Sequence, residues 1–428
     1  MRIDILAIGS QGDVRPHVAL GLGLQTAGHR VRLVTLGGFE EFARGYGLDH
    51  LAIAGSPQEL ASTAEGRDWV AQRGSTIGFL RGFVRVARSV IEQGIANYWG
   101  ACGDVELLVV SSMGLAVGVH IAERLGIPMV RTNLSPFTPT HYDWNGHRSL
   151  LTAVRGNMTA VGGAGFRFLI WRQLRHTTNV ARLNVLGLPP LALKEPFGSL
   201  DRKRVPVLDG YSPTVIARPP DWGDWIHVTG YWFLDSPVDW AAPRELVDFL
   251  AAGPPPVFVG FGSTPFPNPG AATELVVRAL GSAGQRGVIV AGGSGLATGR
   301  LTEDVLSLDA VPHGWLFPQV CAAVHHGGAG VTGAALRAGL PSVVVPVFAD
   351  QPFWGSRVFE LGAGPRPIPA KRLTADTLAR AIDVSLKPNV QRRAATLGEH
   401  IRAEHGVVRA VAAIHDYIGA AHHARRAS

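Results

Sequence analysis

The sequence is poor in the residues that build disulfide frameworks and metal clusters. Only 2 of its 428 residues are cysteine, Cys102 and Cys321, and both stand in apolar stretches. A chain with so few cysteines has no disulfide framework, and a reducing cytoplasm is its simplest location. No Asp-x-Asp pair occurs, and no His and Cys residues have the spacing of metal ligands. We therefore expect a cytoplasmic protein with no metal and no bound cofactor.

Long apolar runs and blocks of like charge are also missing. The longest uncharged apolar run, 107–122, is shorter than the roughly 20 residues of a membrane-spanning helix, and the apolar N-terminal stretch is too brief for a signal peptide. The net charge is +7, yet the only basic run is a short Arg-Arg near the tail. This balance fits an anionic ligand and at most peripheral membrane contact, and it disfavours nucleic acid.

Glycine and apolar residues are abundant. The chain has 53 glycines without a collagen period, 46% hydrophobic residues and 17% charged residues, a composition typical of a globular protein with many tight turns. A chain of 428 residues is too long for one ordinary core and suits two domains.

Apolar strand patterns alternate with helical periodicity, which predicts parallel α/β sheets. We predict strands at 2–8, 29–36, 105–112, 126–133, 225–232, 257–263, 286–295, 305–311, 322–328, 341–351 and 364–369. A proline-bounded stretch suggests an N-terminal domain at 1–235, a linker at 236–254, a second domain at 255–405, and a helix and tail at 406–428 that cross back to the first domain. Two doubly wound domains of this kind face each other across a cleft, where ligands bind at the strand carboxyl ends.

Three glycine-containing loops follow predicted strands. They are "GSQGDVRP" at 9–16, "GFGSTP" at 260–265 and "HHGGAGVT" at 325–332. Each combines glycine with a hydroxyl group or with backbone donors at the start of a helix, and this combination is typical of phosphate-binding loops. The alternative for each loop is an ordinary strand-to-helix turn capped by Ser or Asp, but three such loops in one chain favour an anion site.

One of these loops also matches the dinucleotide-binding pattern G-x-G-x-x-G, through Gly328, Gly330 and Gly333. Asp350 follows at the distance of a ribose-binding acid, so an NAD(P)-dependent oxidoreductase is an alternative. Against it, the pattern lies late in the second domain, and His326 precedes it without a redox reason. Gln351 follows Asp350, and this polar pair suits sugar hydroxyls.

The chain resembles the glycosyltransferase family 1 enzymes of GT-B fold. It is most similar to the branch with sterol 3-beta-glucosyltransferases, rhamnolipid-type rhamnosyltransferases and the glycosyltransferases that decorate antibiotics. The N-terminal "GSQGDVRP" is similar to the family's G-[ST]-x-G-D-x-x-P element, and the stretch 311–365 resembles the sterol-glucosyltransferase motif almost throughout. The similarity covers the C-terminal domain well, but the N-terminal domain only over roughly its first 35 residues.

The resemblance assigns a role to each matching residue. It implies that the donor diphosphate is held by Ser10, Gly12, Ser263, His326, Gly328, Gly330, Val331 and Thr332. It also implies that Val311 offers backbone groups to the nucleotide base, that Asp350 and Gln351 hold the donor sugar, and that Asp13 is the general base. Ala310 and Ala334 stand where plant members have a Trp and a ribose-binding Glu, which leaves uridine versus thymidine open.

The expected activity is that of an inverting, metal-independent O-glycosyltransferase. It would move a hexose or deoxyhexose from a UDP- or dTDP-sugar to a hydroxyl of a lipophilic acceptor, such as a sterol, a polyketide or macrolide, or another natural product. A non-catalytic nucleotide-sugar-binding auxiliary protein is the remaining alternative, and the joint presence of Asp13, His326, Asp350 and Gln351 speaks against it. A monomer and a homodimer both fit, and a histidine assisting Asp13 stays open. Asp13 also stands where the N-cap of a helix is expected, so a capping role competes with catalysis.

Overall fold

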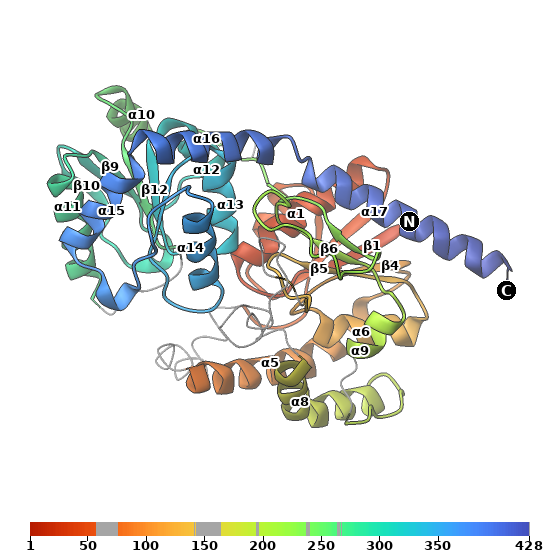
Figure 1. The fold of residues 1–428 in the computed structure, drawn as a ribbon. Coiled ribbons are helices and arrows are strands. Elements are labelled where there is room, and N and C mark those ends of the chain that lie inside the picture. Colours follow the sequence, from red (N-terminus) through yellow and green to blue (C-terminus); the bar gives the residue numbers. More distant parts are fainter. Residues whose placement is uncertain are drawn as a thin grey trace. The chain divides into compact units, whose positions relative to one another are not determined.

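The chain folds into two compact units. The computed structural model describes residues 1–56, 76–140, 142, 164–193, 197–236, 240–262, 266 and 268–427. Unit 1 comprises Met1–Leu234 and His405–Ser428, and unit 2 comprises Asp235–Glu404 (Figure 1). The segment expected to be a linker, 236–254, contains helix α10 (Arg244–Ala251) and belongs to unit 2. Both units are α/β, as the alternation of strands and helices predicts.

Unit 1 is built on a parallel sheet with the order β3-β2-β1-β4-β5-β6-β7. Every neighbouring pair in it is parallel. The strands are β1 (Arg2–Leu6), β2 (Arg30–Thr35), β3 (Asp49–Ala52), β4 (Leu107–Ser111), β5 (Met129–Asn133), β6 (Val207–Asp209) and β7 (Ile226–Val228). The strand order reverses between β1 and β4, and loops at such a switch point are where open α/β sheets bind ligands.

Helices cover both faces of this sheet (Figure 1). They are α1 (Gln11–Thr26), α2 (Glu40–Gly45), α5 (Thr76–Ala101), α6 (Leu115–Leu125), α8 (Ala164–Asn184), α9 (Phe197–Arg202) and α17 (Gly406–Ala427). Ile3 and Ile5 of β1 point to a core shared with α1 and α17, whereas Leu6 points to a core shared with α5, α6 and α8. The alternation of side chains along a strand produces these two cores.

The last helix, α17, packs against α1 at the other end of the sequence. A Cβ atom on Gly23 of α1 would lie 2.4 Å from Cγ1 of Val407, and one on Gly406 would lie 2.4 Å from the Tyr231 carbonyl oxygen. Glycine at both positions is therefore what allows α17 to approach so closely. Ala410, Ile414 and Ile418 of α17 are buried in the core of unit 1.

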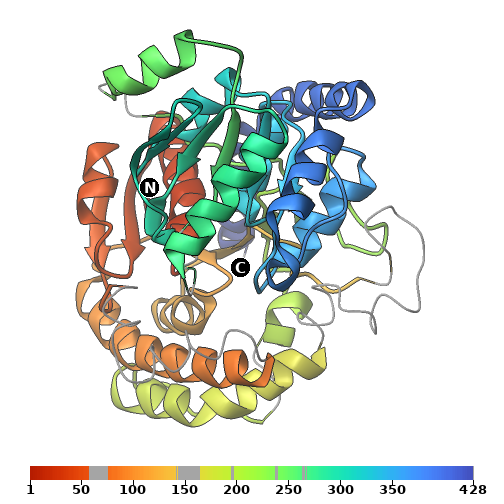
Figure 2. The ribbon, with the colours of Figure 1, turned by 90° about the vertical axis from the view of Figure 1, so that its left-hand side faces the viewer.

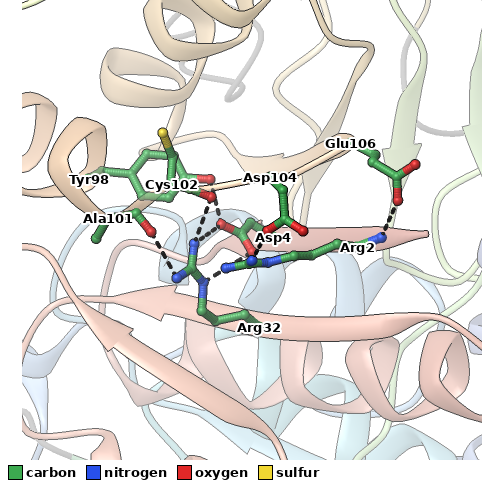
Figure 3. Close-up of polar contacts among 8 residues, drawn as sticks. All are labelled: Arg2, Asp4, Arg32, Tyr98, Ala101, Cys102, Asp104 and Glu106. Atoms are coloured by element: carbon green, nitrogen blue, oxygen red, sulfur yellow. Dashed lines mark hydrogen bonds and ion pairs between the residues drawn. The ribbon is translucent and has the colours of Figure 1, made fainter.

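A buried ion pair fastens α5 to the sheet (Figure 3). Asp4 of β1 accepts hydrogen bonds from Arg32 Nε and Nη2 at 3.2 and 2.5 Å, and from the Tyr98 hydroxyl at 2.7 Å. Arg32 also donates to the carbonyl oxygens of Ala101 and Cys102 at the end of α5. A cation suits a helix C-terminus, whose last carbonyl groups lack partners within the helix.

Unit 2 contains a sheet with the order β10-β11-β9-β8-β12-β13, parallel except between β10 and β11. The strands are β8 (Val257–Gly260), β9 (Gly287–Val290), β10 (Gly299–Thr302), β11 (Val305–Leu308), β12 (Ala322–His325) and β13 (Ser342–Val344). Besides α10, the helices around it are α11 (Pro269–Ser282), α12 (His313–Leu316), α13 (Ala329–Arg337), α14 (Gln351–Glu360), α15 (Ala375–Ser385) and α16 (Pro388–Arg402) (Figure 2). The strand order reverses between β8 and β12, which makes the loops after these two strands the switch point of unit 2.

The strand predicted at 364–369 is wrong. Residues 364–369 form no strand, although Ile368 donates to the Val344 carbonyl oxygen at 2.9 Å. Pro365, Pro367 and Pro369 have no N–H group, so alternate residues cannot join a ladder of hydrogen bonds.

Candidate active site

The turn between β12 and α13 lies at the switch point of unit 2. Gly327 has φ = +88°, and a Cβ atom there would lie 2.6 Å from Cγ1 of Val344. A Cβ atom on Gly328, the N-cap residue of α13, would lie 2.6 Å from Nε2 of His326. Both positions therefore need glycine if the chain is to fold around the histidine ring. G-x-G-x-x-G here follows β12 rather than β8, the first strand of the unit, unlike the usual placement in dinucleotide-binding domains.

This turn offers unpaired hydrogen-bond donors. The first hydrogen bond of α13 is from the Thr332 amide to the Gly328 carbonyl oxygen, so the preceding amides have no acceptor within the helix. Within the described residues, the Thr332 hydroxyl is buried without a hydrogen-bond partner. Gly330 and Val331 belong to this first turn. The positive end of the helix dipole and its amides together suit an anion.

His326 lies partly buried beside these donors. Burial lowers the pKa of its imidazole from 6.5 to about 4, an effect that the Gly260 backbone partly opposes. The ring is therefore neutral at pH 7. Its Nδ1 atom has no hydrogen-bond partner in the described part of the chain. On the β8 side Gly262 has φ = +60°, and a Cβ atom there would lie 3.0 Å from Cε1 of His326, so the ring fills the space beside this glycine.

His325 has a different environment from its neighbour. Its Nδ1 atom accepts a hydrogen bond from the Gly327 amide at 3.1 Å, which fastens the turn. The side chain is fully buried, and burial, His326 and His313 together lower its pKa to about 3. The contact of Nδ1 is that of a structural histidine, while Nε2 is buried without a hydrogen-bond partner in the described residues.

The two residues predicted to hold the sugar lie at the start of α14, where Asp350 is the N-cap. Asp350 Oδ2 accepts a hydrogen bond from Trp354 Nε1 at 2.8 Å. Gln351 is buried, and its Oε1 atom accepts from the amides of Val347 and Phe348 at 2.8 and 3.1 Å. The side-chain oxygen Oε1 of Gln351 thus fastens the loop, and the side-chain NH₂ group is the part suited to donate to a sugar hydroxyl.

Of the two remaining donor-binding candidates in unit 2, the structure describes Val311 but not Ser263. Val311 follows β11 and its side chain is in the hydrophobic core, so the residue can offer only backbone groups to a base. His313 stacks on Phe317, with ring centroids 4.6 Å apart. Ser263 lies outside the described residues.

In unit 1, the loop after β1 brings Ser10, Gly12 and Asp13 together at the start of α1. Ser10 is the N-cap and Asp13 is the third helical residue, so the N-cap position expected for Asp13 is wrong. Asp13 Oδ2 accepts from the Ser10 amide at 2.8 Å and from the Ser10 hydroxyl at 3.0 Å, as the acidic member of a capping box does. A Cβ atom on Gly9 would lie 2.3 Å from the same Asp13 oxygen, so glycine is needed before this pair.

His17, one turn further along α1, was not among the candidates. Its ring contacts the Asp13 carbonyl oxygen through Nδ1 at 2.6 Å and the Thr132 hydroxyl through Nε2 at 2.8 Å. Burial lowers its pKa to about 4. His17 therefore ties the first turns of α1 to the end of β5, and these contacts do not involve the Asp13 carboxylate.

A buried carboxyl group at the end of β6 was also missed. Asp209 accepts hydrogen bonds from Asn133 Nδ2 at 2.9 Å and from the Tyr211 hydroxyl at 3.1 Å. Burial raises its pKa from 3.8 to about 7, against the effect of these two donors. The only signal in the sequence was an acidic residue directly before a glycine at the end of an apolar run.

The two units thus offer different chemistry. Unit 2 has an amide-lined turn with a neutral histidine, which suits a phosphate group, and unit 1 has a carboxylate held by Ser10. Within the described residues, no group of three or more His, Cys, Asp and Glu side chains could hold a metal ion.

Two family models match the chain. Residues 3–142 match the glycosyltransferase family 28 N-terminal domain, and residues 278–406 match the C-terminal domain of the erythromycin biosynthesis protein CIII-like family. The chain is also 35% identical over 440 residues to a sterol 3-beta-glucosyltransferase of Cryptococcus neoformans var. neoformans. That alignment covers 97% of this chain but only 27% of the relative, so the chain spans less than a third of the relative's length.

Solved structures share the fold over nearly the whole chain. The calicheamicin glycosyltransferase CalG4 has a TM-score of 0.69 at 21% identity, and the match covers 98% of both chains. The Streptomyces sp. SF2575 glycosyltransferase SsfS6, complexed with thymidine diphosphate, has a TM-score of 0.64 at 19% identity and covers 97% of this chain and 99% of that one. These similarities confirm the predicted fold class.

Proposed function

Because this chain belongs to the GT-B glycosyltransferases, we propose that it moves a hexose or deoxyhexose from a UDP- or dTDP-sugar to a hydroxyl group of a lipophilic small molecule. The observation that carries the proposal is the β12–α13 turn. Its helix amides lie at the switch point of unit 2 together with Nδ1 of His326 and the Thr332 hydroxyl, which have no partner among the residues that the structure describes. Buried polar groups without partners are rare in proteins, and a bound diphosphate would supply these partners.

In this proposal, unit 2 stabilises the leaving group. Breaking the bond between the sugar and the phosphate develops negative charge on the nucleoside diphosphate. The amides from Gly328 to Val331, the Thr332 hydroxyl and Ser263 would hold that charge. The resemblance adds Ser10 and Gly12 of unit 1 to this set. His326 is neutral at pH 7 because burial lowers its pKa to about 4, so it would contact the diphosphate as a neutral ring and not as a cation. It donates to a phosphate oxygen in the tautomer that carries the proton on Nδ1.

The donor sugar would be held by Asp350 and Gln351. Carboxylate oxygens accept hydrogen bonds from ring hydroxyls, and the NH₂ group of Gln351 donates to them. Because Trp354 and the Val347 and Phe348 amides fix both side chains, these groups are held in place before the sugar binds. Val311 would present backbone groups to the nucleotide base.

Asp13 would be the general base. The acceptor hydroxyl loses its proton to the Asp13 carboxylate as its oxygen forms the new bond to the anomeric carbon, while the bond to the phosphate oxygen breaks on the opposite face. One displacement of this kind inverts the anomeric configuration. We propose that no metal takes part, because the sequence has no Asp-x-Asp pair and the helix turn itself offers donors to the diphosphate.

The acceptor class rests on the relatives. Similarity to a sterol 3-beta-glucosyltransferase and to an enzyme named for calicheamicin supports a lipophilic acceptor. The SsfS6 complex with thymidine diphosphate supports a dTDP-sugar, and the sterol glucosyltransferase supports a glucosyl donor. We propose that the protein works in a reducing cytoplasm as a monomer or homodimer.

The test is a screen of donors followed by acceptors. Purified protein of residues 1–428 is incubated with a panel of UDP- and dTDP-sugars, and release of the nucleoside diphosphate is measured with and without lipophilic alcohols. A parallel series contains excess chelator. We expect acceptor-dependent release that survives the chelator and a product of inverted anomeric configuration. A change in nicotinamide absorbance without nucleoside diphosphate release would support the oxidoreductase, and complete loss with chelator that magnesium restores would contradict the metal-free mechanism.

A further inference from the structure

Helix α8 has one buried face and one unusually apolar exposed face. Trp171, Leu174 and Ala181 are buried, and the helix lies against α5 on the outer side of unit 1 (Figures 1 and 2). Half of the exposed large hydrophobic side chains in the described residues belong to α8 or to the segment that follows it. They are Phe168, Leu169, Val180, Leu183 and Leu193.

The segment after α8 is fixed to the helix. Asn179 donates to the Leu191 carbonyl oxygen at 3.1 Å and accepts from the Leu191 amide at 2.8 Å. Trp171 Nε1 donates to the Ala192 carbonyl oxygen at 3.3 Å. These bonds hold Leu193, which is 48% exposed, next to the Trp171 turn of α8. The exposed apolar side chains therefore lie on a helix and on a segment that hydrogen bonds fix to that helix.

Positive charge accompanies these apolar side chains. The sequence of α8 contains no Asp or Glu, and Arg172 and His176 are exposed on it. They alternate with Leu169, Val180 and Leu183 at spacings of three and four residues, so they share one face. Arg88 of α5 donates to the Gln173 carbonyl oxygen at 3.0 Å, which places another cation beside that face.

We propose that α8 and residues 189–193 form a docking surface for an anionic lipid bilayer. An exposed helix face with apolar side chains around Arg172, and with Arg88 of α5 beside it, suits the boundary between headgroups and acyl chains, where apolar groups insert and cations contact lipid phosphates. The stems of long cationic side chains can lie along this boundary while their charges stay with the headgroups. No helix in the described residues is long and apolar enough to cross a membrane, so the contact is peripheral. This inference does not depend on the proposed glycosyl transfer.

The test uses lipid vesicles, a double variant of the proposed surface and a control variant outside it. Leu169 is 53% exposed, so the Leu169→Glu and Leu193→Glu double variant changes the surface and not the core. Val408→Glu on α17 is the control, because Val408 is 68% exposed in the same unit but outside the proposed surface. Binding is measured by co-sedimentation with phosphatidylcholine vesicles that contain phosphatidylglycerol, and with pure phosphatidylcholine vesicles.

We expect wild-type protein and Val408→Glu to bind the anionic vesicles, with weaker binding at high salt, and the double variant to lose roughly tenfold or more of this binding. Absence of binding by the wild type, or equal loss in Val408→Glu, would overturn the proposal. A wild-type dimer that only the double variant dissociates, without vesicle binding, would assign the surface to a second copy instead. Donor hydrolysis in solution should be equal in all three proteins, so failure of this surface and failure of the proposed function are distinguishable.

Discussion

Ser10 holds the Asp13 carboxylate through two hydrogen bonds to the same oxygen, from its amide at 2.8 Å and from its hydroxyl at 3.0 Å. The arrangement stabilises the start of α1, and it also fixes the orientation of the proposed base. The Asp13 side chain therefore combines a structural role with the proposed catalytic role. Only a substitution that keeps the structural role can reveal the catalytic one.

Asp13→Asn is that substitution. The amide oxygen of Asn still accepts from Ser10, but Asn cannot take a proton at neutral pH. We expect the melting temperature and nucleoside diphosphate affinity to stay near wild type, while the transfer rate falls by about 10²–10⁴-fold. Steady-state transfer assays and calorimetric binding measure the two effects. Normal turnover would make Asp13 a capping residue only.

His326→Ala should weaken the binding of the nucleoside diphosphate. A hydrogen bond to a charged group contributes about 1.5–3 kcal/mol, which corresponds to roughly 10- to 150-fold in affinity. His326→Phe keeps a ring beside Gly262 and should lose a similar factor, which separates the hydrogen bond from packing. Binding of the nucleoside without phosphates is the control and should change little; an equal loss there would place His326 away from the diphosphate.

Asp350→Asn should reduce sugar transfer far more than it reduces nucleoside diphosphate binding. The substitution keeps an oxygen that can accept from Trp354, so the start of α14 stays intact. Trp354→Phe is the companion variant, because it removes the indole donor and leaves the carboxylate. Kinetics with the full donor and titration with the diphosphate separate the two contributions, and equal losses in both would assign Asp350 to the nucleotide or to the fold.

Arg32→Met should destabilise unit 1 strongly. Removing one partner of a buried ion pair costs about 3–5 kcal/mol, because Asp4 would remain as an uncompensated buried charge. The control is Arg2→Met, which breaks the exposed pair between Arg2 and Asp104 (Figure 3) and should cost about 0–1 kcal/mol. Urea unfolding followed by circular dichroism compares them, and similar losses would mean that Arg32 contributes little beyond a surface pair.

The raised pKa of Asp209 predicts that the stability of the folded protein decreases as the pH rises. Burial raises its pKa from 3.8 to about 7, so the folded protein keeps a proton that the unfolded chain releases between these values. The stabilisation from this proton is complete below about pH 4 and is lost as the pH rises to 7, at up to about 1.4 kcal/mol per unit. The melting temperature of the wild type should therefore fall from pH 5 to pH 8 more than that of Asp209→Asn, so the variant becomes relatively more stable at pH 8. A constant difference would contradict the raised pKa.

Local patterns predicted the elements that carry the site, and long-range contacts explain what was missed. The glycine spacing around 326–333 indicates a close turn, and at Gly327 and Gly328 a nearby atom excludes a side chain. His17 and Asp209 could not be recognised, because their partners Thr132 and Asn133 lie on β5, which is distant from both residues in sequence. The strand predicted at 364–369 fails for a local reason, since apolar composition was read without counting the missing N–H groups of its prolines.

The return of α17 to unit 1 has a consequence for synthesis on the ribosome. Residues 1–234 are translated before unit 2, yet the core around α1 lacks Ala410, Ile414 and Ile418 until α17 has been translated. Unit 2 is continuous in sequence and is complete before α17 appears. Because domains tend to fold as units during translation, unit 1 begins to fold before unit 2 but completes its core after unit 2. Until α17 is translated, the apolar face of α1 that α17 covers stays exposed in the nascent chain.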